Sequence, residues 1–129
     1  MSMDLIGAVD DIPERGLRFS YREGPFDEEG ILIKLADGRM VAYKNECRHL
    51  PMRLDDREPR ELWDRAGLHL VCSSHGAMYR PEDGLCTQGP CKGSHLRRLP
   101  IEVHNGEVFL DTAKVGGFFE IPRNNVSTL

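Results

Sequence analysis

The sequence predicts an all-β fold, an antiparallel sandwich or barrel, from three observations. Two stretches rich in apolar residues each contain a residue pair that is typical of hairpin turns, Asp37-Gly38 and Asn105-Gly106. The chain of 129 residues contains 13 glycines and 8 prolines, which favours many turns between short strands. Hydrophobic residues make up 40% and charged residues 29% of the chain, a composition typical of one globular domain with its own core.

Each expected element follows from a local pattern. Leucine, phenylalanine and tyrosine alternate with polar residues in the first strand, and Asp37-Gly38 suits a two-residue type I′ turn between the next two strands. Leu62 and Trp63 lie between charged residues, as in a short amphipathic helix. The expected elements are a strand at 17–21, a hairpin of 31–36 and 39–44, two helical turns at 58–65, a strand at 68–71 and a hairpin of 101–104 and 108–110.

Charge and hydropathy exclude several classes of protein. The net charge is −4, so the chain lacks the basic surface that nucleic acids require. It has no apolar run of the length that spans a membrane, and its first residues lack the basic and apolar regions of a signal peptide. We therefore expect a cytoplasmic protein with no membrane or nucleic-acid partner. In that compartment, the four cysteines favour metal or thiol chemistry over disulfides.

Charge is distributed unevenly along the chain. Residues 47–99 contain nine basic and seven acidic residues, whereas the segments on either side are acidic. This difference predicts either a basic docking surface for an acidic partner or chance scatter of surface charge. The basic residues close to the cysteine motifs in the sequence are Arg48, Arg53, Arg80 and Lys92.

Two short motifs combine cysteine with histidine. They are Cys47-Arg48-His49 and Cys72-Ser73-Ser74-His75, with 22 residues (50–71) between them. Two thiolates and two neutral imidazoles form a four-ligand set that suits a tetrahedral zinc ion. The same set suits an iron–sulfur cluster with sulfur ligands on one iron and nitrogen ligands on the other. A single such motif would be weak, but two pairs together indicate a metal centre.

In these motifs the sequence resembles the Rieske iron–sulfur proteins, whose pattern is C-x-H followed by C-x-x-H-G. The resemblance continues through Ala77-Met78-Tyr79 and Gly89-Pro90 to the last hairpin, and covers roughly residues 4–111. It implies a Rieske-like fold, in which a small cluster-binding subdomain of loops and short strands joins an antiparallel sandwich or barrel. The implied organisation is a single domain at 1–111, with a cluster-binding part at about 47–99 and a C-terminal tail at 112–129.

The resemblance also implies roles for individual residues around a [2Fe–2S] cluster. Cys47 and Cys72 would hold the inner iron, and His49 and His75 the outer iron near the surface. Neutral imidazoles in place of two thiolates make the oxidised site formally neutral, which places such clusters at roughly −150 to +300 mV against about −400 mV for plant-type ferredoxins. The residues expected to surround the cluster are Arg48, Gly76, Ala77, Tyr79, Gly89 and Pro90.

Departures from the family pattern indicate where the potential lies in this range. High-potential Rieske proteins have a disulfide between the two ligand loops, whereas this chain has Leu50-Pro51 and Ser73-Ser74 at those places. They also have a serine donor at the position of Ala77, although the tyrosine donor is present as Tyr79. Arg48 replaces a frequent proline. It is expected to raise the potential, to meet an acidic partner, or to be a solvated cation with neither role. The resemblance thus implies a low-to-moderate potential and not quinol oxidation.

The expected function is a soluble one-electron carrier and not an enzyme. It would pass electrons from a flavin-containing reductase to a terminal oxygenase or another acceptor, docking through an acidic patch on the partner. A 129-residue chain has no room for the mononuclear iron domain of an oxygenase. Two alternatives remain: an accessory small subunit of the nitrite-reductase type, and a zinc-binding interaction module. The remaining Cys86 and Cys91 are expected to be reduced thiols in the cytosol, with a redox-sensing pair as the alternative.

Overall fold

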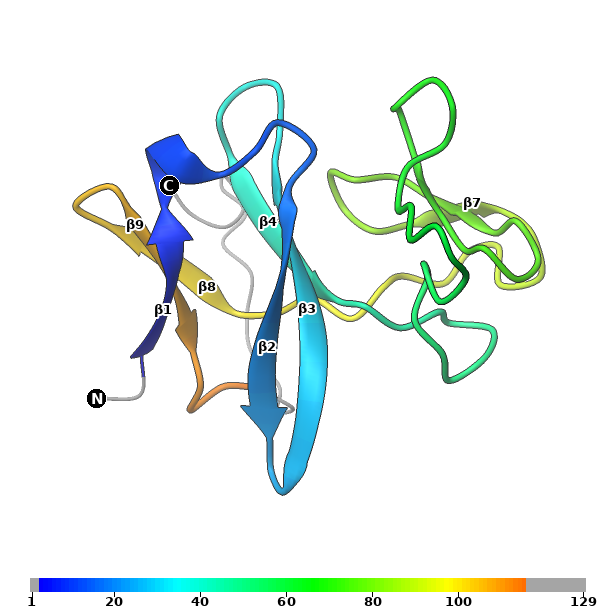
Figure 1. Ribbon diagram of the computed structural model, residues 1–129. Coiled ribbons are helices and arrows are strands. Elements are labelled where there is room, and N and C mark those ends of the chain that lie inside the picture. Colours follow the sequence, from blue (N-terminus) through cyan, green and yellow to red (C-terminus); the bar gives the residue numbers. More distant parts are fainter. Residues whose placement is uncertain (1–2, 116–129) are drawn as a thin grey trace. The chain divides into compact units, whose positions relative to one another are not determined.

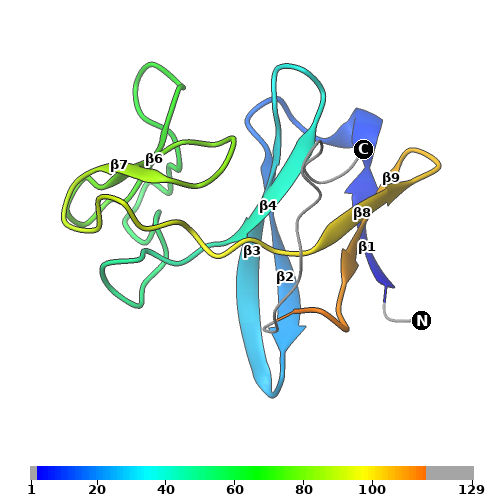
Figure 2. The same ribbon diagram turned by 180° about the vertical axis from the view of Figure 1, so that it is seen from behind.

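The computed structural model describes residues 3–115, which form strands, loops and one short 3₁₀ helix (Figures 1 and 2). No helix in this part of the chain is long and apolar enough to cross a membrane. Because the regular elements are strands apart from one 3₁₀ helix, the all-β class that the sequence predicted is confirmed. The elements are β1 (Met3–Ala8), η1 (Val9–Asp11), β2 (Leu17–Glu23), β3 (Phe26–Lys34), β4 (Met40–Lys44), β5 (Leu70–Val71), β6 (Met78–Tyr79), β7 (Cys86–Gln88), β8 (Ile101–His104) and β9 (Glu107–Asp111).

The described residues divide into two compact units, one formed by residues up to 44 and from 98 onward and the other by residues 45–97. The first unit contains two antiparallel sheets with strand orders β1-β9-β8 and β2-β3-β4 (Figure 1). Apolar side chains from both sheets form a single core, as in a sandwich or barrel. The buried members of this core are Ile12, Tyr21, Leu32, Met40, Ala42, Leu99, Ile101, Val108 and Leu110.

Both predicted hairpins are present, but one turn differs from the prediction. Asn105 and Gly106 have φ values of 51° and 78° and connect β8 directly to β9, as a type I′ turn requires. Between β3 and β4, the Leu35 amide donates to the Arg39 carbonyl at 2.8 Å, which leaves a three-residue loop at 36–38. Gly38, with a φ of 91°, occupies the left-handed position of that longer loop. The predicted two-residue turn at Asp37-Gly38 was therefore wrong.

The predicted helix at 58–65 is also wrong. The Leu62 carbonyl accepts a hydrogen bond from the Val71 amide at 2.8 Å, and Trp63 forms a bridge with Leu70. The segment therefore pairs with β5 and does not form hydrogen bonds along its own axis.

The unit formed by residues 45–97 has little regular structure. Its sheet, β5-β6-β7, consists of strands of two or three residues joined by loops (Figure 2). Hydrogen bonds between loops therefore determine the positions of the side chains in this unit. Of the predicted tail at 112–129, residues from 116 onward lie outside the described part of the chain.

Candidate metal centre

Both Cys/His motifs lie on loops of the 45–97 unit, and each loop is closed by its own backbone hydrogen bonds. In the first loop, the Cys47 amide donates to the Met52 carbonyl at 2.8 Å. In the second, the Cys72 amide donates to the Ala77 carbonyl at 2.8 Å, and the Gly76 amide donates to the Cys72 carbonyl at 3.0 Å. Gly76 has a φ of 73°, a conformation that glycine adopts without strain, which explains the glycine after the second motif.

The two cysteines place buried sulfur atoms next to each other. Cys47 and Cys72 are 5% and 1% exposed, and each thiol is close enough to affect the pKa of the other. The backbone amides of Leu50 and His49 also point at the Cys47 sulfur, the latter at 3.4 Å, and the Ser74 amide points at the Cys72 sulfur. N–H groups directed at sulfur stabilise thiolates, which are the form that binds metals.

The two thiols respond differently to this environment. Burial opposes ionisation of Cys47, but hydrogen bonds from the Leu50 amide and the Tyr79 hydroxyl outweigh it and hold the pKa of Cys47 below its usual value. Burial raises the pKa of Cys72, and the neighbouring Cys47 sulfur raises it further. A bound cation would offset the cost of placing the second thiolate beside the first.

The two histidines, in contrast, lie at the surface. His49 and His75 are exposed, and their rings pack edge to face with centroids 5.1 Å apart. The Ser74 hydroxyl lies 3.2 Å from Nδ1 of His75. The four side chains therefore form two pairs. Both members of one pair are buried thiols, and both members of the other pair are exposed imidazoles.

This donor set fits a [2Fe–2S] cluster. Such a cluster contains two irons, and in the mixed-ligand type each iron takes two protein ligands of one kind. Within residues 3–115, no three His, Cys, Asp or Glu side chains converge on one point as ligands of a single metal ion. The buried pair of thiols and the exposed pair of imidazoles match the two ligand types of such a two-iron site.

The hydroxyl of Tyr79 links the first ligand loop to the loop that contains Cys91. It accepts a hydrogen bond from the Arg48 amide at 3.1 Å and lies 3.6 Å from the Cys47 sulfur. It also lies 3.0 Å from the Cys91 sulfur, a contact that the sequence did not predict. Burial and the contact with Cys91 raise the pKa of Tyr79 far above its usual value, so the hydroxyl keeps its proton and can donate it to sulfur.

Gly89 packs against the second ligand loop. A Cβ atom at position 89 would lie 2.8 Å from the Cα of Ala77, and Gly89 has a φ of 107°, so only glycine fits here. Ala77 is buried, whereas Gly89 and Pro90 are exposed. The chain therefore crosses the second ligand loop at the position that the resemblance implied for a covering loop.

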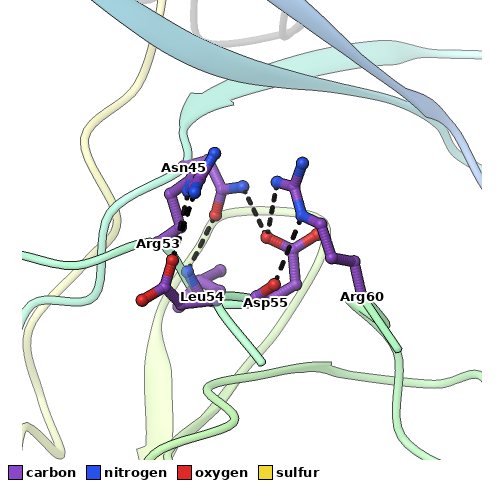
Figure 3. Close-up of polar contacts among 6 residues, drawn as sticks. Asn45, Arg53, Leu54, Asp55 and Arg60 are labelled. Carbon is purple, nitrogen blue, oxygen red and sulfur yellow. Dashed lines mark hydrogen bonds and ion pairs between the residues drawn. The ribbon is translucent and has the colours of Figure 1, made fainter. Parts of the chain in front are cut away.

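A buried polar network supports the ligand loops, and sequence reasoning missed it (Figure 3). The Asn45 side chain accepts a hydrogen bond from the Leu54 amide at 2.9 Å and donates to the Asp55 carboxylate at 2.9 Å. Arg60 donates to the same carboxylate at 3.1 Å. The Leu54 carbonyl accepts from the Ser73 amide at 2.7 Å, which ties the first ligand loop to the second. No short motif marks these residues, because Asn45, Asp55 and Arg60 are five or more positions apart in the sequence.

The structure changes the picture of charge around the site. Residues 45–97, the unit that the structure defines, contain eight basic and eight acidic residues, so the basic excess of 47–99 depended on where the segment was cut. Arg53 pairs with Asp56, and Arg80 with Asp83. Arg48 lies in the first ligand loop and Lys92 follows the covering residues Gly89 and Pro90. Within the described residues, both side chains are exposed and neither forms an ion pair.

Comparison with known proteins adds a family match. The model of the Rieske [2Fe-2S] domain family matches residues 4–109. No curated protein matches the chain.

Several solved structures share the fold at low sequence identity. A ferredoxin of carbazole 1,9a-dioxygenase from Nocardioides aromaticivorans IC177 is 18% identical, with a TM-score of 0.61, covering 85% of this chain and 97% of that chain. The Sphingomonas yanoikuyae B1 ferredoxin is 18% identical, with a TM-score of 0.57, covering 83% of this chain and 95% of that chain. The terminal oxygenase of carbazole 1,9a-dioxygenase from Novosphingobium sp. KA1 is 17% identical, with a TM-score of 0.65. That match covers 97% of this chain and 34% of the oxygenase chain.

Proposed function

The chain belongs to the Rieske [2Fe-2S] domain family, and on this premise we propose that it is a one-electron carrier. The cofactor of this family is a [2Fe–2S] cluster, as the sequence predicted. In the proposal, Cys47 and Cys72 hold the inner iron, and His49 and His75 hold the outer iron.

The observation that carries the proposal is the separation of the two ligand types. The thiols of Cys47 and Cys72 are buried next to each other, whereas the rings of His49 and His75 are exposed next to each other. The bound cluster accepts and releases one electron. The exposed imidazoles would give that electron a short path to a partner protein, and burial of the two cysteines would shield the sulfur ligands from water.

The surrounding residues hold and adjust this site. The Tyr79 hydroxyl lies 3.6 Å from the Cys47 sulfur, and hydrogen bonds to ligand sulfurs help to set the potential of such clusters. Gly89 and Pro90 cover the second ligand loop next to Ala77. We assign the whole arrangement to one domain at 1–111 with a cluster-binding part at about 47–99. The compact unit at 45–97 supports this division.

In the proposal, this chain is an electron carrier and not itself an enzyme. A flavin-containing reductase donates the electron to it, and a terminal oxygenase accepts the electron from it. The similar solved structures include a dioxygenase ferredoxin and a complex of a reduced oxygenase with an oxidised ferredoxin. The matching chain of that complex is 19% identical to this chain, with a TM-score of 0.63. This chain spans about a third of the oxygenase chain that shares its fold.

The test of the proposed cofactor and carrier role is spectroscopic. The purified chain is expected to be red-brown and to contain two irons. After anaerobic reduction, it is expected to show one unpaired electron with the low average g-value of mixed nitrogen and sulfur ligation. A colourless zinc protein would instead support an interaction module. A protein without metal would support an accessory subunit of the nitrite-reductase type, and either result would overturn the proposal.

The proposed partner presents an acidic patch to Arg48 and Lys92. Reversing both with Arg48→Glu and Lys92→Glu is expected to lower the second-order electron-transfer rate by about tenfold at low ionic strength, because long-range attraction brings charged partners together. The rate of the native protein is also expected to fall with added salt, as screening shortens the Debye length to about 10 Å at 0.1 M. The measurement is stopped-flow electron transfer to the terminal oxygenase.

The matched control changes the net charge equally in the other unit. Arg18→Glu with Arg22→Glu alters two exposed cations of β2 and is expected to leave most of the rate intact. If both double variants slow transfer equally, the total charge and not a local patch governs the encounter. A native rate that is insensitive to salt would show that the two cations are solvated and play no part in docking.

A further inference from the structure

A second pair of cysteines lies beside the candidate metal centre. The sulfur atoms of Cys86 and Cys91 are 3.2 Å apart, both as free thiols. Cys86 is buried at the start of β7, whereas Cys91 is partly exposed in the loop that follows Gly89 and Pro90. Two thiols at this separation need a movement of only about 1 Å to reach the bond length of a disulfide.

The loop holds the two thiols in register. The Cys86 amide donates to the Ser94 carbonyl at 2.8 Å, and the Gly93 amide donates to the Cys86 carbonyl at 2.9 Å. The Ser94 hydroxyl and amide both donate to the Cys91 carbonyl, at 2.6 and 3.0 Å. The backbone on either side of the pair is therefore fixed, and closure of the sulfur–sulfur bond requires little reorganisation.

The hydrogen bonds of these thiols run in one direction. Cys86 donates its S–H to the Gln88 carbonyl at 3.3 Å, so its sulfur is free to accept from the S–H of Cys91. With the Cys91 proton used in this way, the Cys91 sulfur accepts the proton of the Tyr79 hydroxyl at 3.0 Å. The reduced pair therefore competes for the Tyr79 proton with the more distant Cys47 sulfur, which lies at 3.6 Å.

We propose that Cys86 and Cys91 are a reversible dithiol–disulfide site whose state is transmitted through Tyr79 to the Cys47 ligand. The transmission rests on the proposed cluster, whereas the disulfide itself does not. In the disulfide form, Cys91 is a poorer acceptor, and the Tyr79 proton turns to the Cys47 thiolate, since charged acceptors form stronger hydrogen bonds. A stronger donor on a ligand sulfur stabilises the reduced cluster and raises its potential.

A low-molecular-weight disulfide of the glutathione type is the oxidant. The partly exposed Cys91, as thiolate, attacks one of its sulfurs, forms a mixed disulfide and releases one small thiol. Cys86 then loses its proton, attacks the Cys91 sulfur and releases the second small thiol. The protein loses two electrons and two protons in total, and the small disulfide gains them as two thiols.

The test uses the cluster-loaded protein in anaerobic mixtures of reduced and oxidised glutathione. Free thiols are then alkylated and the peptides are mapped by mass spectrometry. The expected product is a Cys86–Cys91 bridge, with a loss of two hydrogen masses that reductant reverses. Glutathione that stays attached to Cys91, or no change in any mixture, would overturn the proposed site.

Two variants test the transmission separately from the bridge. The midpoint potential of the native cluster is expected to be higher in the disulfide form than in the dithiol form. In the Tyr79→Phe variant the bridge is expected to form as before while the shift in potential disappears. In the Cys91→Ser variant neither bridge nor shift is expected. A shift that persists in Tyr79→Phe would show that the tyrosine is not the link. A protein that forms the bridge but holds no iron would contradict the proposed carrier and leave the thiol site standing.

Discussion

The Cys72→Ser and His75→Ala variants are expected to purify without the visible absorption and the iron of the native protein. Each removes one of two ligands from one iron, and a hydroxyl or a methyl group cannot replace a thiolate or an imidazole on iron. The loss is expected to be complete because the remaining ligand of each pair is monodentate. The measurement is iron content per chain, with the visible spectrum as a second readout.

Matched controls separate ligand loss from general damage. Cys86→Ser and Cys91→Ser also remove one thiol each from the same unit, and both variants are expected to keep two irons. His104→Ala removes an exposed imidazole that pairs with Glu102 in the other unit, and it is also expected to keep them. Iron retained in Cys72→Ser or His75→Ala, or lost in Cys86→Ser, would show that the ligands are assigned wrongly.

The features that sequence predicted well are those that depend on neighbouring residues. Asn105-Gly106 specifies its turn because both residues tolerate positive φ, and the Cys/His motifs bring two donors to one loop each. These constraints act within a few residues, so tertiary packing does not override them. The fold class follows, because two such hairpins with many turn residues leave few other architectures.

The features that sequence missed depend on contacts between distant residues. The outer half of β3 is rich in acidic residues, which hide the strand pattern, yet it pairs with β2 along its length. The segment at 58–65 has a helical charge pattern, but pairing with β5 places it in an extended conformation. The contact of Tyr79 with Cys91 joins strand β6 to a residue twelve positions further along the chain, in the loop after β7. No periodicity encodes such contacts, and the structure is needed to find them.

The buried network below the ligand loops leads to the prediction with the largest effect on stability. The Asp55 carboxylate has no exposed surface and receives hydrogen bonds from Asn45 and Arg60. Arg60→Met is expected to lower the free energy of unfolding by about 3 kcal/mol, since removing one partner of an ion pair is strongly destabilising when the remaining carboxylate is fully buried. The measurement is denaturant unfolding of the cluster-loaded protein, followed by circular dichroism and by cluster absorbance.

The neighbouring Arg53 provides a matched control for this prediction. Its pair with Asp56 is 3.2 Å long, but the two side chains are 48% and 42% exposed, so Arg53→Met is expected to cost less than about 1 kcal/mol. Adding Asp55→Asn to Arg60→Met removes the buried charge, and this double variant is expected to regain more than about half of the lost stability. Because the Leu54 carbonyl accepts from the Ser73 amide, the Arg60→Met protein is also expected to lose its cluster absorbance at lower denaturant than the native protein. Equal, small losses in Arg53→Met and Arg60→Met would show that water compensates Asp55, and that the network does not hold the two ligand loops together.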